Sequence, residues 1–192
     1  MEYIKLLTAL KRNNLYIFSL RDIENLFPNE NLKTLKNNLT RWIGKGRFAR
    51  IKRELYEFIE PGRQPSISDL YIANKIYFPS YISLETALSY YGIIPETIYT
   101  ITSITTKATK EFETPRSIFI YHKIKQQAFT GYRATRLEGV VVLFAEAEKA
   151  LADYLYFVDL KKKSLNDRLE LRNINKAKLI KYVKLFNRPN LL

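Results

Sequence analysis

The stretch LKTLKNNLTRWIGKGRFARIKRELYEFI, residues 32–59, holds a helical pattern followed by two short apolar runs. Within about a third of the helical circumference fall Leu32, Leu35, Leu39, Trp42 and Ile43, which predicts a helix with one apolar side. Gly44 and Gly46 predict that the helix ends in a flexible turn. The runs RFARI and LYEFI, joined by KRE, predict a β-hairpin with a dense run of positive charge.

The preceding segments predict the rest of a small domain. EYIKLLTALKRNN places Ile4, Leu7 and Leu10 on one side of an expected helix, and LYIF is a short β-prone run. In SLRDIENLF, Ser19 with an acidic residue three positions later is close to a capping box, and either asparagine after Pro28 can cap the next helix. The order helix, strand, helix, helix, hairpin is that of a winged helix-turn-helix.

Sequence pattern divides the chain into two domains. We expect the winged helix-turn-helix over residues 1–60, a linker over 61–66 in the run EPGRQPS, and a second domain over 67–192. The predicted fold class is α+β, in which the winged domain is followed by a mixed α/β domain with a helical C-terminus.

The second domain is predicted to contain two helices, then a run of strands, then further helices. SDLYIANKIY and SLETALSYYG predict helices, the latter capped by Ser83, and TIYTITSITT, RSIFIYHKI and EGVVVLFA predict strands. Two final helices are expected near 164–172 and 175–186. The intervening AEAEKALADYLYFV predicts a helix that places Ala147, Leu151, Tyr154, Leu155 and Val158 on one side.

Charge is concentrated towards the two ends of the sequence. The formal net charge of +13 divides into +6 over residues 1–64, −1 over 65–160 and +8 over 161–192. This segregation indicates polyanions or acidic protein surfaces as partners. The chain has no cysteine, which excludes disulfides and thiolate metal sites and suits a reducing cytoplasm. No segment approaches the roughly 18 apolar residues of a membrane span, so we expect a cytoplasmic protein without a membrane partner.

The polar side of the 32–43 helix and the basic hairpin form the main candidate site. Duplex DNA has a major groove about 12 Å wide that admits one helix, in which Asn37 could pair with adenine and Arg41 with guanine. The hairpin cations would meet phosphates and make binding salt-dependent. Two other interpretations are a three-helix fold with a solvated polar side and a protein-docking module. The candidate DNA-binding residues are Lys33, Thr34, Lys36, Asn37, Thr40, Arg41, Lys45, Arg47, Arg50, Lys52 and Arg53.

A second basic surface is predicted near the C-terminus. The last expected helix places apolar residues on one side and cations on the other, a pattern of helices that bind nucleic acid, anionic lipid or acidic proteins. The alternative is a helix that packs its apolar side on the domain and leaves its lysines solvated. The residues of this surface are Lys161, Lys162, Lys163, Lys178, Lys181, Lys184 and Arg188.

Enzymatic motifs are few. His122 is the only histidine, which leaves little for a histidine-based triad or metal cluster, and neither a P-loop nor G-x-G-x-x-G occurs. Asp159-Leu160-Lys161 resembles half of a nuclease signature without a convincing second carboxylate. We therefore expect a non-enzymatic protein with no catalytic residues, no metal and no cofactor.

Several segments together resemble the AbiEi family, the antitoxin and transcriptional-regulator components of type IV, abortive-infection toxin–antitoxin systems. They are RIKRELYEFI, YISLETALSYYGIIPETIYTITSITTK, SIFIYHKI, GYRAT and VLFAEAEKALADYLYF, in an order that covers roughly residues 5–190. The segment YISLETALSYYGIIP is the most specific of them, whereas the winged part is generic.

The resemblance implies two activities. The winged domain would bind inverted repeats in an operator and repress its own operon, and the C-terminal domain would counteract a cognate nucleotidyltransferase toxin in phage defence. The family brings no catalytic residues. Some members are orphan regulators without a toxin, so the alternatives are an orphan winged-helix regulator or a protein-interaction module.

Overall fold

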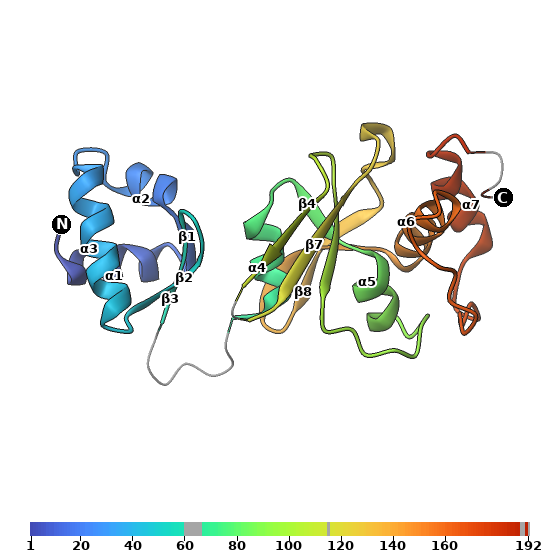
Figure 1. The fold of residues 1–192 in the computed structure, drawn as a ribbon, viewed down its shortest axis with the longest axis horizontal. Helices are drawn as coiled ribbons and strands as arrows, with labels where there is room; N and C mark the ends of the chain where they lie inside the picture. Colours follow the sequence, from blue (N-terminus) through green and yellow to red (C-terminus); the bar gives the residue numbers. More distant parts are fainter. Residues whose placement is uncertain (60–66, 115, 189–190, 192) are drawn as a thin grey trace. The chain divides into compact units, whose positions relative to one another are not determined.

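A computed structural model describes residues 1–59, 67–114, 116–188 and 191 of the chain. The described residues form α-helices and two β-sheets, in agreement with the predicted α+β class (Figure 1). The chain divides into two compact units, Met1–Ile67 and Ser68–Leu192. The linker predicted over 61–66 lies outside the described residues.

Over residues 1–59, the first unit contains three helices and a three-stranded sheet. The sheet is antiparallel in the order β1-β3-β2, so the strand between the first two helices joins the later hairpin. The elements are α1 (Tyr3–Arg12), β1 (Ile17–Ser19), α2 (Leu20–Leu26), α3 (Leu32–Gly44), β2 (Phe48–Lys52) and β3 (Leu55–Phe58).

Side-chain caps fix where α2 and α3 begin. The predicted capping box is confirmed, because the Asp22 amide donates to Ser19 Oγ at 3.2 Å and the Ser19 amide donates to Asp22 Oδ2 at 2.7 Å. Asn31 is the asparagine that caps α3, since its Oδ1 accepts from the amides of Lys33 and Thr34. Both caps satisfy amides that have no partner inside the helix.

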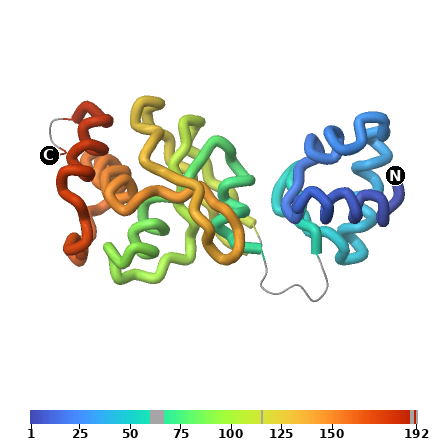
Figure 2. Tube along the Cα trace, turned by 180° about the vertical axis from the view of Figure 1, so that it is seen from behind, coloured from blue at the N-terminus to red at the C-terminus, as the bar shows by residue number. Residues whose placement is uncertain are grey.

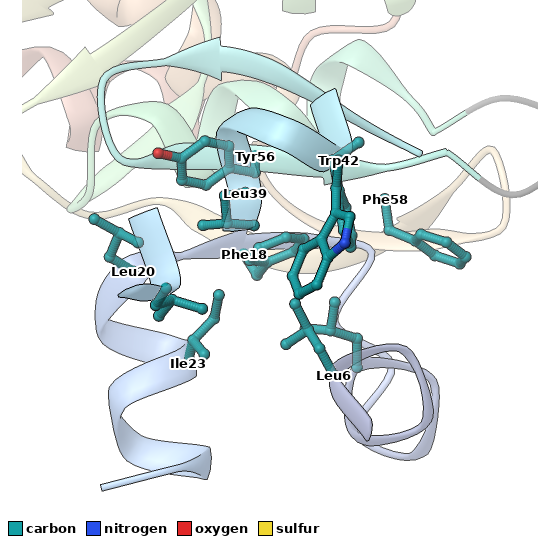
Figure 3. Packing of buried hydrophobic residues seen from close by; sticks show 11 residues of the cluster. Leu6, Phe18, Leu20, Ile23, Leu39, Trp42, Tyr56 and Phe58 are labelled. Carbon is teal, nitrogen blue, oxygen red and sulfur yellow. The ribbon is translucent and has the colours of Figure 1, made fainter. Parts of the chain in front are cut away.

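Aromatic rings fill the core of the first unit. Figure 3 shows side chains from all three helices and the sheet gathered around Phe18 of β1. The Phe18 ring lies 5.4 Å from that of Phe48 and 5.8 Å from that of Tyr56, and Trp42 of α3 lies 6.0 Å from Phe48. The hairpin therefore packs on the apolar side of α3 through its rings.

The prediction of the buried side of α1 was wrong in one position. Ile4 is 71% exposed, whereas Leu6 and Leu10 are buried. Leu6 and Leu10 are one turn apart, while Ile4 lies about 200° around the helix from Leu6 at 100° per residue. Leu7 is partly buried, so the core-facing side of α1 is rotated from the predicted one.

The second unit is built on a six-stranded mixed sheet. Its strand order is β6-β7-β5-β4-β9-β8, with β5–β7 and β4–β9 parallel and the other pairs antiparallel. The elements are α4 (Asp69–Ile76), β4 (Ser80–Ile82), α5 (Leu84–Tyr90), β5 (Ile101–Thr105), β6 (Lys110–Glu113), β7 (Ile118–Lys123), the 3-10 turn η1 (Gln126–Ala128), β8 (Tyr132–Leu137), β9 (Val140–Ala145), α6 (Ala147–Asp159) and α7 (Lys176–Lys184).

Helices cover both faces of the sheet. Tyr121 of β7 donates its hydroxyl to a carbonyl of α4 at 2.6 Å, whereas the neighbouring residue His122 contacts Phe157 of α6 on the opposite face. Because successive side chains of a strand point to opposite faces, α4 and α6 lie on opposite sides of the sheet. This explains why all three residues of β4 are buried. α7 lies alongside α6, where the orange and red segments run together (Figure 2).

The helix predicted over 164–172 was wrong, because this segment forms turns. Asn166 Oδ1 accepts from the Arg168 amide at 2.8 Å, and the Glu170 amide donates to Ile93 O at 2.8 Å. A polar side chain and a distant carbonyl therefore take the amides that a helix would use. The final predicted helix is present as α7 but is shorter than 175–186.

A buried ionic network holds α6 to β4 and to the start of α5. Lys149 and Asp153, one turn apart and both fully buried, form an ion pair. The second carboxylate oxygen of Asp153 accepts from Tyr81 Oη at 3.0 Å and from Ser83 Oγ at 2.8 Å. Ser83 thus occupies the N-cap position of α5 without capping it. Burial raises the pKa of Asp153, while Lys149 and the two hydroxyl donors oppose this effect.

Lys149 also reaches the segment that follows α7. Lys149 Nζ lies 4.7 Å from the centre of the Phe186 ring, beyond the end of α7. Of the five residues predicted on one side of this helix, Leu151 and Tyr154 are buried, whereas Ala147, Leu155 and Val158 are half-buried. Gly131, at φ +75°, lies so close to the network that a Cβ there would come within 2.8 Å of Lys149 Cγ and 2.7 Å of Tyr182 Cε1.

We predict that Asp153→Asn destabilises the protein by about 3–5 kcal/mol, because it leaves the Lys149 ammonium buried without a counter-charge. Adding Lys149→Met to this variant should restore part of the loss, since it removes the uncompensated charge. Urea denaturation followed by circular dichroism measures both effects. A loss below about 1 kcal/mol in the single variant would contradict the ionic interpretation.

Candidate nucleic-acid interface

The apolar side of α3 is buried and its polar side is exposed. Leu35, Leu39 and Trp42 face the core, whereas Leu32, predicted on the same side, is 41% exposed in the first turn. The polar side chains that the sequence singles out are all exposed, namely Lys33, Thr34, Lys36, Asn37, Thr40 and Arg41. Together they form a surface that we call the α3 ridge.

Internal hydrogen bonds divide the α3 ridge into two kinds of residue. Thr40 Oγ1 donates to the Lys36 carbonyl at 3.0 Å, and Arg41 Nη2 donates to Asn38 Oδ1 at 3.1 Å. Within the described part of the chain, the side chain of Asn37 makes no hydrogen bond. Its amide therefore keeps a donor pair and an acceptor for a ligand, whereas the guanidinium of Arg41 is already oriented by its neighbour.

The hairpin continues the ridge through its turn. Glu54, in the turn between β2 and β3, lies with a carboxylate oxygen 3.8 Å from Lys36 Nζ. Its carbonyl accepts from the Leu20 amide at 3.3 Å, which ties the turn to the start of α2. The pairing of β2 and β3 shifts register between Arg50 and Lys52, as at a β-bulge. The turn of the basic hairpin is therefore fixed to the start of α2.

The hairpin cations differ in how firmly they are held. The Arg47 guanidinium lies 4.2 Å from the centre of the Tyr3 ring, a cation–π contact. Arg50 Nε donates to the Lys52 carbonyl at 3.4 Å. Lys45 and Arg53 are exposed, and Lys52 is half-buried. The sequence did not identify the Tyr3 ring or the Lys52 carbonyl as the groups that contact these cations.

The predicted C-terminal basic surface is partly neutralised within the second unit. Lys163 pairs with Glu85, and Arg188 pairs with Asp159 at 2.6 Å. Lys178 lies 2.9 Å from Glu146 and 3.4 Å from Glu148 at the start of α6. These three cations hold the tail of the chain on α5 and α6. The described residues provide no ion pair for Lys161, Lys162, Lys181 and Lys184, and these four lysines are exposed.

Glu146 connects α6 to α7 through a hydrogen bond and an ion pair. Tyr182 Oη donates to Glu146 Oε2 at 2.5 Å, and Lys178 lies beside the same oxygen. The Tyr182 hydrogen bond, together with Lys178, lowers the pKa of Glu146 below its usual range. A carboxylate with a lowered folded-state pKa contributes stability above its ordinary pKa, and this contribution is lost as pH falls.

The groups considered for enzymatic chemistry have structural contacts. His122 packs 4.9 Å from the Phe157 ring, and burial lowers its pKa to about 4, so it is neutral near pH 7. Asp159 of the Asp-x-Lys tripeptide is engaged by Arg188. Across the described ranges, no three His, Asp or Glu side chains are grouped so that they could hold a metal ion. None of the described helices has the length and apolarity to cross a membrane.

Comparison with known proteins gives no assignment. No profile of a known protein family matches the chain, and no curated protein matches it significantly.

We predict that Tyr182→Phe makes the protein less stable at neutral pH and that this deficit shrinks as pH falls. The hydrogen bond stabilises the ionised form of Glu146, whose ordinary pKa is 4.5, so its contribution disappears when the carboxylate is protonated. Urea denaturation between about pH 7 and pH 3 measures the effect. Tyr99→Phe, at a tyrosine that is 85% exposed, is the matched control and should not alter the pH dependence.

Proposed function

We propose that this chain is a cytoplasmic, DNA-binding transcriptional repressor that reads duplex DNA with the α3 ridge. The observation that carries the proposal is an apolar-backed helix whose exposed side presents amide, hydroxyl and cationic groups next to a basic hairpin. A major groove about 12 Å wide accepts one helix, and base edges are read by such groups.

The arrangement of the first unit supports a winged helix-turn-helix. Its order, α1-β1-α2-α3-β2-β3, and its sheet, β1-β3-β2, place the hairpin beside the helix that would enter the groove. In this role Asn37 reads a base, while Arg41 enters the groove in the orientation that Asn38 gives it. Arg50 and Arg53 contact phosphates, which fix the register without reading sequence.

We further propose an antitoxin role for the second unit, on the basis of the resemblance to the AbiEi family. The most specific segment, YISLETALSYYGIIP, contributes Tyr81 and Ser83 to the hydrogen bonds around Asp153. The resemblance thus rests on residues that organise the second unit as well as on the generic first unit. The alternative is an orphan regulator or protein-interaction module without a toxin.

Two experiments test these roles. An electrophoretic shift with the region upstream of its own operon, containing inverted repeats, should show a specific complex at low salt. Folded protein that gives no shift would refute repression. Co-expression with a nucleotidyltransferase encoded in the same operon should relieve the growth arrest caused by that toxin, and persistent arrest would refute the antitoxin role.

We predict that Arg41→Ala weakens operator binding by about 1–3 kcal/mol and weakens random DNA less, because the lost contact is to a base. Arg53→Ala should weaken both DNAs equally and reduce the salt slope by about 1, as expected for a phosphate contact. Fluorescence anisotropy at several salt concentrations separates the two. Arg12→Ala, at an exposed arginine that ends α1, is the control and should change neither affinity.

We predict that Glu54→Gln tightens DNA binding and steepens its salt dependence, because it removes a negative charge beside Lys36. The Lys36–Glu54 pair is about half exposed, so the free energy of unfolding should change by no more than about 0.5 kcal/mol. Unchanged or weaker binding by this variant would show that the hairpin turn lies away from DNA.

A further inference from the structure

An apolar groove lies beside α7 in the second unit. Its lining residues belong neither to the α3 ridge nor to the ion pairs between α6 and α7. Its volume is about 430 Å³. Its apolar walls come from Leu155 of α6, Leu171 and Ile174 of the loop before α7, Leu179, Ile180 and Val183 of α7 itself, and Leu191 after α7. We call this feature the α7 groove.

The α7 groove leaves large apolar side chains in contact with water. Leu171 is 48% exposed and Ile180 is 41% exposed, although Val183 at the floor is buried. Single exposed apolar residues are ordinary on protein surfaces. Here they converge on one concave site, which is typical of a surface that receives another apolar group.

The rim of the α7 groove is positively charged. Lys176 lines it, and Lys184 lies one turn beyond Ile180 on the same side of α7. Both lysines are exposed, no ion pair engages either of them among the described residues, and the described lining contains no acidic side chain. Residues 161–192 as a whole carry ten Lys or Arg against two Asp or Glu.

We propose that the α7 groove docks an amphipathic, acidic helix of a partner protein. Such a helix presents apolar side chains at positions i, i+3, i+4 and i+7, which an apolar groove buries. Its carboxylates would then meet Lys176 and Lys184 at the rim, where complementary charge orients the partner. This proposal does not depend on the DNA-binding role of the first unit.

The same features argue against other occupants. A second copy of this chain in a symmetric pair would bring two positive rims together, which is unfavourable. Nucleic acid uses polar, charged surfaces and does not need an apolar groove. Small-molecule sites usually add several convergent polar groups to an apolar pocket, and the described lining offers only Lys176. The apolar side chains line a concavity, whereas a helix that lies in a membrane interface presents an apolar face to the lipid.

The test uses the full chain and two fluorescein-labelled synthetic peptides of about 20 residues, long enough to form a helix. Both contain the same numbers of leucine and glutamate. In the first the leucines share one helical side, and in the second they are distributed around the helix. Fluorescence anisotropy should show binding of the first peptide and an affinity about tenfold lower for the second. Equal binding of the two, or no binding of the first, overturns the proposal.

Two variants locate the binding site. Ile180→Glu places an anion in the groove and should lower the affinity for the first peptide about tenfold or more. Lys181→Glu alters charge more strongly at the adjacent position, which is not part of the groove lining, and should have a smaller effect. Circular dichroism establishes that both variants are folded, and the shift with operator DNA gives a separate readout of the first unit. Equal loss in both variants would indicate general charge attraction and overturn the proposal.

The remaining occupants are distinguished by two further measurements. Co-sedimentation with vesicles of phosphatidylcholine and phosphatidylserine tests a membrane, and sedimentation equilibrium tests self-association. We expect neither to depend on Ile180. Vesicle binding or dimerisation that is abolished by Ile180→Glu would assign the groove to lipid or to a second copy and overturn the proposal.

Discussion

The fully buried carboxylate of Asp153 is the contact on which the second unit depends. It accepts from Lys149 of its own helix and from the hydroxyls of Tyr81 and Ser83, so one side chain joins α6, β4 and the start of α5. Burying a charge is costly unless it is paired and hydrogen-bonded. The side chains around Asp153 meet that requirement together, and they therefore specify how the central strand and its covering helix are matched.

The first unit depends on apolar contacts instead. Trp42 and the rings of the hairpin pack against each other, and this contact turns the opposite side of α3 outward. The α3 ridge is therefore exposed because the apolar residues on the other side of the helix are buried. The packing of the elements is therefore fixed differently in the two units. Ring contacts and helix caps specify it in the first unit, and a buried ion pair specifies it in the second.

Sequence periodicity predicted those features whose cause is local. The Ser19 capping box, the α3 helix and the hairpin all follow from residues within one turn or one strand of each other. The exposed side of α3 was predicted for the same reason, since spacing at 100° per residue determines which side chains share a side. Leu32 departs from that pattern because it lies in the first turn, where less of the unit covers it.

Features set by distant residues could not be predicted in this way. Ser83 looks like an ordinary cap, but its hydroxyl is taken by Asp153, seventy residues later in the chain. The 164–172 segment has helical composition, yet its backbone bonds to Ile93 and to its own asparagine. The basic tail likewise suggested one continuous surface, whereas Lys178 and Arg188 are paired with acids of α6. Each case requires knowing which segments meet in space.

Gly131 lies next to both the Lys149–Asp153 ion pair and the Tyr182–Glu146 hydrogen bond. It sits where the chain enters β8, and any side chain there would press on Lys149 and Tyr182 together. The first of these belongs to the central ion pair and the second to the attachment of α7. A methyl group at this position would therefore disturb the ion pair of α6 and the attachment of α7 at the same time. The packing of the two helices thus depends on a residue without a side chain in the loop before β8.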